Sequence, residues 1–244
     1  MLYNGYFRKI KELLESVEVT QKDAIERSAE LVAESIKNGG VLHVFGCGHS
    51  QMYATEVCYR AGGLVPVNAI ITPALSLAPN APLSTFGERQ EGLAKSILDN
   101  QNINENDVML IASTSGRNVV PIEMAIEAKN RGLKVIALTS YGFAESVTSR
   151  HKSGKKFYEF ADVVLDNEGV SGDGIMELEG LEARFGPTSS IIGFTLIQSI
   201  IVQTVDNLVK LGVKPPIWVS SNLDKGDKIN KEYIDRYRNK ISLL

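Results

Sequence analysis

Short apolar runs alternate with amphipathic stretches along most of this chain. The apolar runs predict buried strands at 41–45, 64–71, 108–113, 134–138 and 163–166. Apolar residues at helical spacing predict helices at 52–61, 88–98 and 119–131, and longer helical segments at 6–38 and 188–211. Strands that alternate with helical crossovers are typical of parallel sheets. The pattern therefore predicts an α/β fold, a three-layer αβα sandwich around a roughly five-stranded parallel sheet with flavodoxin- or Rossmann-like topology.

The remaining segments predict irregular structure and the domain organisation. Residues 72–87 hold three prolines and residues 167–186 are rich in glycine and acidic residues, so we expect loops in both. A polar helix is expected at 231–240. We interpret residues 1–40 as a helical arm, 41–212 as the α/β domain, and 213–244 as a tail that packs on this domain or on a neighbouring subunit.

Charge and cysteine usage exclude several classes of protein. The net charge is −3 and the pI is near 5.7, which argues against a nucleic-acid or membrane partner. The two cysteines form no CxxC motif and no Cys/His cluster, so we expect reduced thiols, no metal and a cytoplasmic protein. The apolar stretch Ile191–Val202 is interpreted as too short and too polar for a membrane span.

Two turns rich in glycine and hydroxyl residues follow predicted strands. Ser113-Thr114-Ser115-Gly116-Arg117-Asn118 joins a strand to a helix, where hydroxyls and free N–H groups favour an anion. Gly46-Cys47-Gly48-His49-Ser50 occupies the same position after the first strand. Both lie at the carboxyl edge of the sheet, where such folds bind ligands. Gln51 replaces the third glycine of a dinucleotide fingerprint and no Walker loop is present, so we expect neither a nucleotide nor any other cofactor.

Together with Gly186-Pro187-Thr188-Ser189-Ser190, these turns resemble the SIS (sugar isomerase) family. The resemblance covers about residues 5 to 212 and is greatest to the single-domain branch with phosphoheptose isomerase and N-acetylmuramic acid 6-phosphate etherase. It implies a phosphorylated sugar as ligand, with the phosphate bound by Ser50, Ser113, Ser115, Gly116 and Asn118. We expect Gly48, Thr114, Thr188 and Ser189 of the same turns to contribute to phosphate or substrate binding.

The catalytic group has several candidates. Aldose–ketose isomerisation needs a base that moves a proton between adjacent carbons, and an acid that serves the oxygens. The predicted helix 88–98 begins with Glu88 and Glu91 on one face, and Glu91 lies in a segment that resembles the catalytic segment of the etherase. Glu56 and His49 follow the first turn. His43, inside a predicted strand, is interpreted as a satisfied core residue.

We therefore expect a protein that binds a phosphorylated sugar, an amino or N-acetyl sugar phosphate, and isomerises it. An etherase or lyase of the same family and a non-catalytic sugar-phosphate sensor are the alternatives. The helix at 188–211 is apolar almost all round, which predicts a homodimer or homotetramer. Trp218 is expected either to stack on a sugar ring or to anchor the tail.

Overall fold

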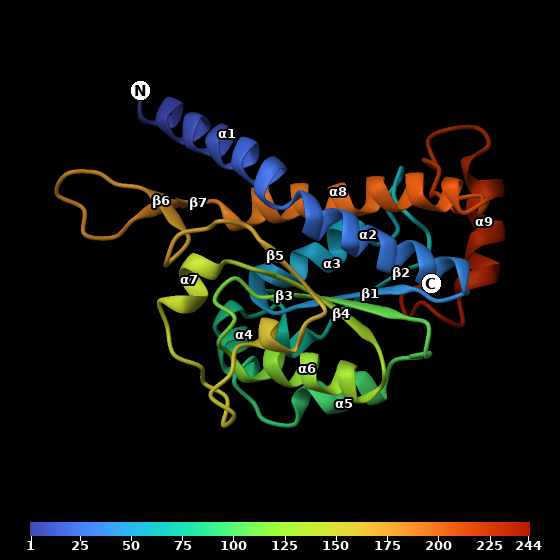
Figure 1. Cartoon of the computed structure of the whole chain (residues 1–244), viewed down its shortest axis with the longest axis horizontal. Helices are drawn as coiled ribbons and strands as arrows, with labels where there is room; N and C mark the ends of the chain where they lie inside the picture. Colours follow the sequence, from blue (N-terminus) through green and yellow to red (C-terminus); the bar gives the residue numbers. More distant parts are fainter.

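A computed structural model describes residues 1–244 and contains the predicted five-stranded parallel sheet (Figure 1). Its strands stand in the order β2-β1-β3-β4-β5, a flavodoxin-like order, and run over Val67–Ile70, Leu42–Gly46, Val108–Ala112, Lys134–Thr139 and Val163–Asp166. β1 and β3 are central, and they pair in register from Leu42 with Val108 to Gly46 with Ala112. The turns that follow these two strands are therefore neighbours at one edge.

Helices cover both faces of the sheet, which confirms the α/β sandwich (Figure 1). On one face lie α2 (Lys22–Lys37), α3 (Met52–Val57) and α8 (Ser189–Lys210). The other face is covered by α5 (Leu93–Asp99) and α6 (Val119–Asn130), with α4 (Ala81–Gly87) near its edge. α7 (Tyr141–Glu145) follows β4.

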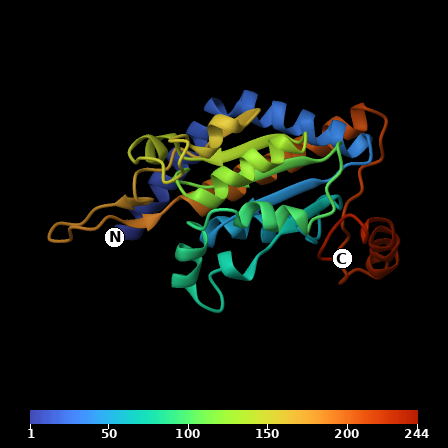
Figure 2. The same cartoon turned by 90° about the horizontal axis from the view of Figure 1, so that it is seen from below.

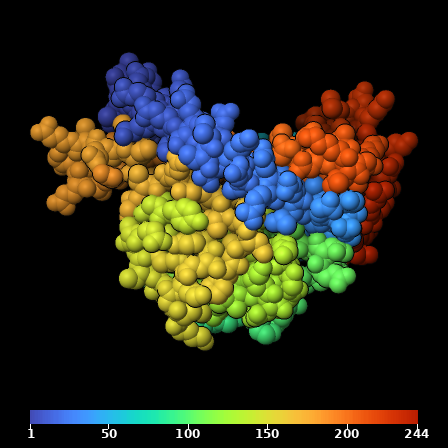
Figure 3. All heavy atoms as spheres, viewed as in Figure 1, coloured from blue at the N-terminus to red at the C-terminus, as the bar shows by residue number.

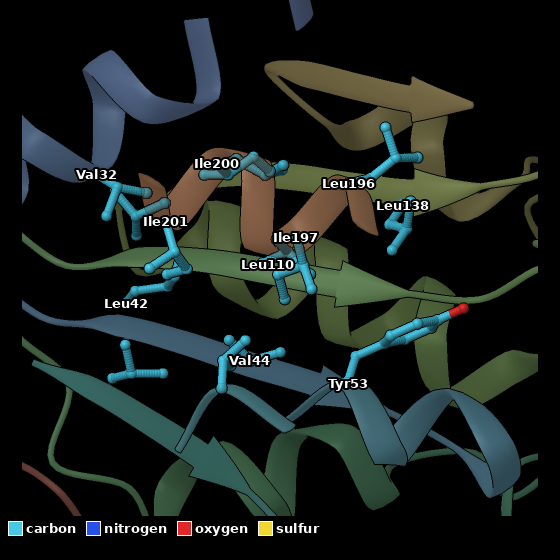
Figure 4. Packing of buried hydrophobic residues seen from close by; sticks show 14 of the residues in the cluster. Val32, Leu42, Val44, Tyr53, Leu110, Leu138, Leu196, Ile197, Ile200 and Ile201 are labelled. Carbon is cyan, nitrogen blue, oxygen red and sulfur yellow. The ribbon is translucent and has the colours of Figure 1, made fainter. Parts of the chain in front are cut away.

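The alternation of side chains along each strand divides the core between the two faces. Leu42, Val44 and Leu110 pack toward α8, where Ile197 and Ile201 meet them (Figure 4). The intervening residues, such as Phe45 and Ile111, pack toward α5 and α6. Both faces of the sheet are apolar because both are covered by helices.

α8 is longer than the apolar stretch recognised in the sequence. Its 22 residues, with a mean hydropathy of 1.4 in the most apolar window, are long and apolar enough to cross a membrane by length and composition. Our interpretation that the segment is too short was therefore wrong. However, Ile192, Leu196, Ile197 and Ile200 are buried against the sheet and α2, which is the arrangement of a core helix.

Several expected boundaries differ from the structure. The helix predicted from Glu88 begins only at Leu93, so Glu88 and Glu91 do not share a helix face. The expected loop 72–87 contains α4, which has a proline in its first turn, where proline is favourable. The expected loop 167–186 contains the antiparallel strands β6 (Gly174–Met176) and β7 (Phe185–Pro187).

The β6–β7 hairpin projects from the body beside α1 (Leu2–Thr20), as Figures 2 and 3 show. The phenol of Tyr6 donates a hydrogen bond to the carbonyl of Pro187 and so ties the two together. α1 and α2 are separate helices that meet at Gln21.

The tail lies at the opposite end and carries α9 (Gly226–Tyr237). Trp218 is 3% exposed and packs edge-on against Tyr59 and Tyr233, so it anchors the tail. His43 is completely buried and bonded on both ring nitrogens, which confirms it as a satisfied core residue.

Candidate functional site

A cavity of about 340 Å³ opens at the carboxyl edge of β1 and β3. Its size is within the range of small-molecule sites. Neither lysine nor arginine lines it. The lining is mostly small and polar and comprises Cys47, His49, Ser50, Tyr53, Glu88, Ala112, Ser113, Thr114, Ser115, Asn118, Phe143, Asp173, Pro187, Ser189 and Ser190.

The turn after β3 presents unpartnered donors to this cavity. The hydroxyls of Ser113, Thr114 and Ser115 line it and make no hydrogen bond within the chain. The backbone N–H groups of Thr114, Ser115 and Arg117 also lack an acceptor in the chain. Gly116 adopts φ 62, a left-handed conformation that glycine takes readily, within this turn. Successive free N–H groups in a turn of this kind are typical of an anion-binding nest.

The turn itself is firmly held. Ser113 donates its N–H to the carbonyl of Leu138 at 3.0 Å, and Thr139 donates its hydroxyl to the carbonyl of Ser113 at 2.9 Å. The donors are therefore oriented before any ligand arrives, and little ordering is needed on binding.

The turn after β1 supplies a second part of the cavity wall. A Cβ at Gly46 would lie 2.3 Å from the carbonyl oxygen of Ser50, so only glycine permits this close turn. Gly48 adopts φ 57, and the chain then passes through a 3₁₀ turn over Gly48–Gln51. This turn places the His49 and Ser50 side chains on the cavity wall.

Glu88 is a half-buried carboxylate on the cavity wall. It follows α4, and its carbonyl accepts the N–H of Val120, which fixes it beside the start of α6. Burial raises the pKa of the Glu88 carboxyl, while the Asn118 side chain and the guanidinium groups of Arg89 and Arg150 lower it only part of the way back. A carboxyl with a raised pKa keeps its proton to higher pH than an exposed glutamate does, which favours a role in proton transfer.

A second carboxylate, that of Asp173, closes the cavity at the N-terminus of α8. It accepts the N–H groups of Thr188 and Ser189 at 3.0 and 2.9 Å and the Ser189 hydroxyl at 2.6 Å. The Thr188 hydroxyl also donates to it, at 3.3 Å. The hydroxyls of Thr188 and Ser189, two predicted binding groups, are thus occupied within the chain. Thr188 is fully buried, while Ser189 lines the cavity.

Tyr53 on α3 completes this wall. Its phenol donates to the carbonyl of Ser189 at 2.7 Å, and burial raises its pKa, with Asp173 adding to the effect. A Cβ at Gly193 would lie 2.3 Å from the phenol oxygen, so glycine there makes room for the tyrosine.

Two predicted catalytic residues lie outside the cavity. Glu91 has a side chain that is 65% exposed, and its nearest cation is Lys152 at 3.9 Å. Glu56 pairs with Arg60 at 2.7 Å and accepts from Gln198 at 3.2 Å. Of the four catalytic candidates, the structure brings only Glu88 and His49 to the cavity.

Asp173, Tyr53 and Cys47 also line the cavity but were not among the sequence candidates. Asp173 is flanked by Gly172 and Gly174 and adopts φ 65, which is uncommon for aspartate. An acidic residue between two glycines was the available signal. Burial raises the pKa of the Cys47 thiol well above its usual value, and Glu88 adds to this, so the thiol remains protonated.

The comparisons with known proteins agree with this architecture. The UPF0309 protein of Geobacillus thermodenitrificans is 41% identical over 243 residues, which cover 100% of this chain and 98% of that protein. A UPF0309 protein of Halalkalibacterium halodurans is 47% identical over 235 residues, covering 96% of this chain and 97% of that protein.

Solved structures of phosphoheptose isomerases share the fold. Those from Francisella tularensis and Neisseria gonorrhoeae align with TM-scores of 0.55 and 0.53, each at 18% identity. The alignments cover 83% and 85% of this chain and 95% and 97% of theirs. Residues 5–140 match the SIS domain, so the chain belongs to the SIS domain family, as the resemblance of its turns indicated.

Proposed function

We propose that the cavity binds a phosphorylated sugar and that the protein isomerises it between aldose and ketose. The observation that carries the proposal is the meeting of the unpartnered hydroxyls at 113–115, Glu88 and His49 around one cavity. The two turns would hold the phosphate through hydroxyl and N–H donors. The fold shared with phosphoheptose isomerases supports a phosphosugar ligand.

In this reaction Glu88 acts as the base. Its carboxylate removes a proton from the carbon next to the carbonyl, which leaves an enediol, and the resulting acid returns the proton to the neighbouring carbon. His49 moves the matching proton between the two oxygens. The raised pKa of Glu88 favours this role because a base whose pKa lies nearer the working pH both accepts and releases a proton readily.

For the sugar we propose an amino or N-acetyl sugar phosphate, and for the protein a cytoplasmic homodimer or homotetramer. Exposed apolar side chains on α8 and α1 favour self-association, since Val202 is 69% exposed and Phe7 61%.

The test begins with a thermal-shift screen of sugar phosphates against the full chain. Ligands that stabilise it are then incubated in deuterated water, and exchange at the carbon next to the carbonyl is followed by NMR. We expect stabilisation, exchange and an isomeric product. Elimination products would instead favour the etherase or lyase, and stabilisation without exchange or product would favour a sensor.

Ser115→Ala provides a check on the phosphate site. Loss of a hydrogen bond to a charged group costs about 1.5–3 kcal/mol, so the affinity for the ligand should fall about ten- to hundredfold. Ser96→Ala, at an exposed position on α5, is the matched control. Equal affinities of the two variants would contradict the assigned phosphate site.

A further inference from the structure

The loop between α7 and the 3₁₀ turn Phe157–Phe160 is basic and covers the end of the turn at 113–118. Residues 146–156 hold four lysine or arginine side chains and no acidic one, in a chain whose net charge is −3. The N–H of Arg150 donates to the carbonyl of Arg117 at 2.8 Å, and that of Phe157 donates to the carbonyl of Gly116 at 3.3 Å. A concentration of positive charge is therefore fixed beside the predicted phosphate site.

The three lysines of this loop have partners within the chain. Lys156 donates to the carbonyls of two residues before it and so closes the loop. Lys155 lies over the ring of Phe160, with Nζ 5.5 Å from the ring centroid. Lys152 lies 3.9 Å from the carboxylate of Glu91. The contacts of these lysines account for their positions without a ligand.

Arg117 and Arg150 differ from the lysines because neither forms an ion pair with a carboxylate, as four other arginines do. Nη1 of Arg150 donates to Oδ1 of Asn118 at 2.6 Å, and Asn118 lines the cavity. Arg117 makes only a long bond, 3.4 Å from Nη2 to Oγ1 of Thr148. Its Nε–H is shielded from solvent and has no acceptor in the chain. Two guanidinium groups with unused donors thus lie beside the cavity.

This arrangement is unfavourable without an anion. Burial lowers the pKa of Arg150, and the charges of Arg117 and Arg89 lower it further, which agrees with guanidinium groups held near one another. Glu88 acts on Arg150 in the opposite direction but forms no ion pair with it. A shielded N–H without an acceptor is a further cost to the fold. Guanidinium groups match phosphate and carboxylate oxygens in charge and in geometry, so an oxyanion would relieve both costs.

We propose that Arg117 and Arg150 form an oxyanion subsite at the rim of the cavity, which binds a second anionic group, a phosphate or a carboxylate, of the phosphorylated ligand. This inference rests on the proposed function, because the donors at 113–115 bind the first phosphate. Arg150 contacts Asn118 on the cavity wall, while no arginine lines the cavity itself. The second anionic group therefore projects out of the cavity, and the subsite selects doubly anionic sugars over simple monophosphates.

The first experiment uses inorganic phosphate and the full chain. ¹H–¹⁵N NMR follows the Nε–H signals of Arg117 and Arg150 during titration, with sodium chloride at equal ionic strength as the reference. We expect both signals to shift to saturation with phosphate only. Arg150→Gln should weaken phosphate binding at Arg117 about tenfold, since a charge-assisted bond is lost. Arg238→Gln on α9, an arginine paired with Asp235, is the matched control and should change nothing.

The same titration separates this proposal from the proposed function. The backbone N–H signals of Thr114 and Ser115 report the first phosphate site, and Ser115→Ala should weaken binding there while the arginine signals still respond. A response at the arginines alone would leave the subsite standing and contradict the proposed phosphate site. A response at 113–115 alone, or loss of the arginine response in Ser115→Ala, would overturn the subsite.

The second experiment tests whether one ligand fills both sites. Calorimetry compares fructose 6-phosphate with fructose 1,6-bisphosphate, and glucose 6-phosphate with gluconate 6-phosphate, at constant ionic strength. The doubly anionic member of a pair should bind about tenfold more tightly, and Arg150→Gln should abolish this difference. Arg150→Lys keeps the charge but not the planar fork, so it should retain part of the difference, and it serves if Arg150→Gln does not fold. Equal affinities within both pairs, or a difference that survives in Arg150→Gln, would overturn the proposal.

Discussion

Each of the two ends of the sheet's strands has a carboxylate removed from full solvent contact, Asp107 buried and Glu88 half-buried, and their pKa values are shifted in opposite directions. At the amino edge, Asp107 accepts the N–H groups of Val41 and Asn104, each at 2.8 Å, and Nε2–H of His43 at 2.9 Å. Burial alone would raise the pKa of Asp107, but these donors hold it below its usual value. At the carboxyl edge, burial raises the pKa of Glu88 because its donors are too few.

The polar side-chain atoms of Asp107, His43 and Asn68 all have hydrogen-bond partners within the chain. Asn68 accepts the N–H of Ser242 with Oδ1, so its Nδ2 points to Nδ1 of His43, and His43 must donate from Nε2 to Asp107. No polar atom of this network remains free to bind a ligand. The bond from Ser242 to Asn68 ties the C-terminal residues to the strands. The comparison teaches that burial raises the pKa of a carboxyl only where few hydrogen-bond donors offset it.

The largest effect on activity should come from neutralising Glu88, the carboxylate with few hydrogen-bond donors. Glu88→Gln is expected to lower kcat about 10²–10⁴-fold, the usual contribution of a positioned proton carrier. Its free energy of unfolding at pH 7 should be unchanged or higher, because a partly desolvated charge is removed. Kinetics on the sugar phosphate and urea unfolding test this pair of results. Full activity in Glu88→Gln would show that the base is another residue.

Asp107→Asn should have the opposite profile. The new NH₂ group faces donors, and His43 cannot change its tautomer without confronting Asn68, so we expect a loss of about 2–4 kcal/mol in the free energy of unfolding. The folded fraction should keep its ligand affinity, because the site lies at the far edge. Urea titration measures the loss against Glu105→Gln, an exposed neighbour. Equal stability of the two variants would contradict the role assigned to Asp107.

The sequence allowed the sheet and both turns to be predicted because each depends on local pattern. Apolar runs mark β1 and β3, and the rule that parallel strands end at one edge brings Ser50 and Ser113 together. The position of Glu88 depends instead on a tertiary contact. The N–H of Gly92 donates to Glu123 at 2.7 Å, so a residue of α6 sets the start of α5 and leaves Glu88 outside the helix.

The place of Asp173 on the cavity wall could not be predicted from local sequence pattern for the same reason. β6 and β7 are short and contain glycine and proline, so their sequence favours a loop. Their pairing joins Gly174 with Pro187 and Met176 with Phe185, and the bonds from the start of α8 to Asp173 join residues 15 and 16 positions apart. Only the folded chain brings that carboxylate to the cavity, whereas Ser113, Thr114 and Ser115 are recognisable from one hexapeptide.

The pH dependence of stability should separate the two carboxylates with opposite signs. The folded pKa of Asp107 is depressed, so its contribution is present above the unfolded pKa of about 3.9 and is lost as the pH falls through the folded value. The folded pKa of Glu88 is raised, so its cost is absent below about pH 4.3 and appears as the pH rises through the folded value.

Urea unfolding between pH 3 and pH 7 measures these pH-dependent contributions to stability. It compares the natural chain with Asp107→Asn and Glu88→Gln. The deficit of Asp107→Asn should shrink as the pH falls below about 4, while any advantage of Glu88→Gln should grow as the pH rises above that range. Parallel curves for all three proteins would contradict the assigned directions.

The smallest effects on kcat are expected from the carboxylates that are exposed to solvent or paired with a cation. Glu91 is exposed and Glu56 is paired with Arg60, and neither lines the cavity as Glu88 does. Glu91→Gln and Glu56→Gln should each change kcat less than about threefold, within the range of surface substitutions. The same assay that detects the loss in Glu88→Gln measures both. A large loss in Glu56→Gln would place the reacting proton on the α3–α8 side of the molecule, and burial would then no longer distinguish the reactive carboxylate from the others.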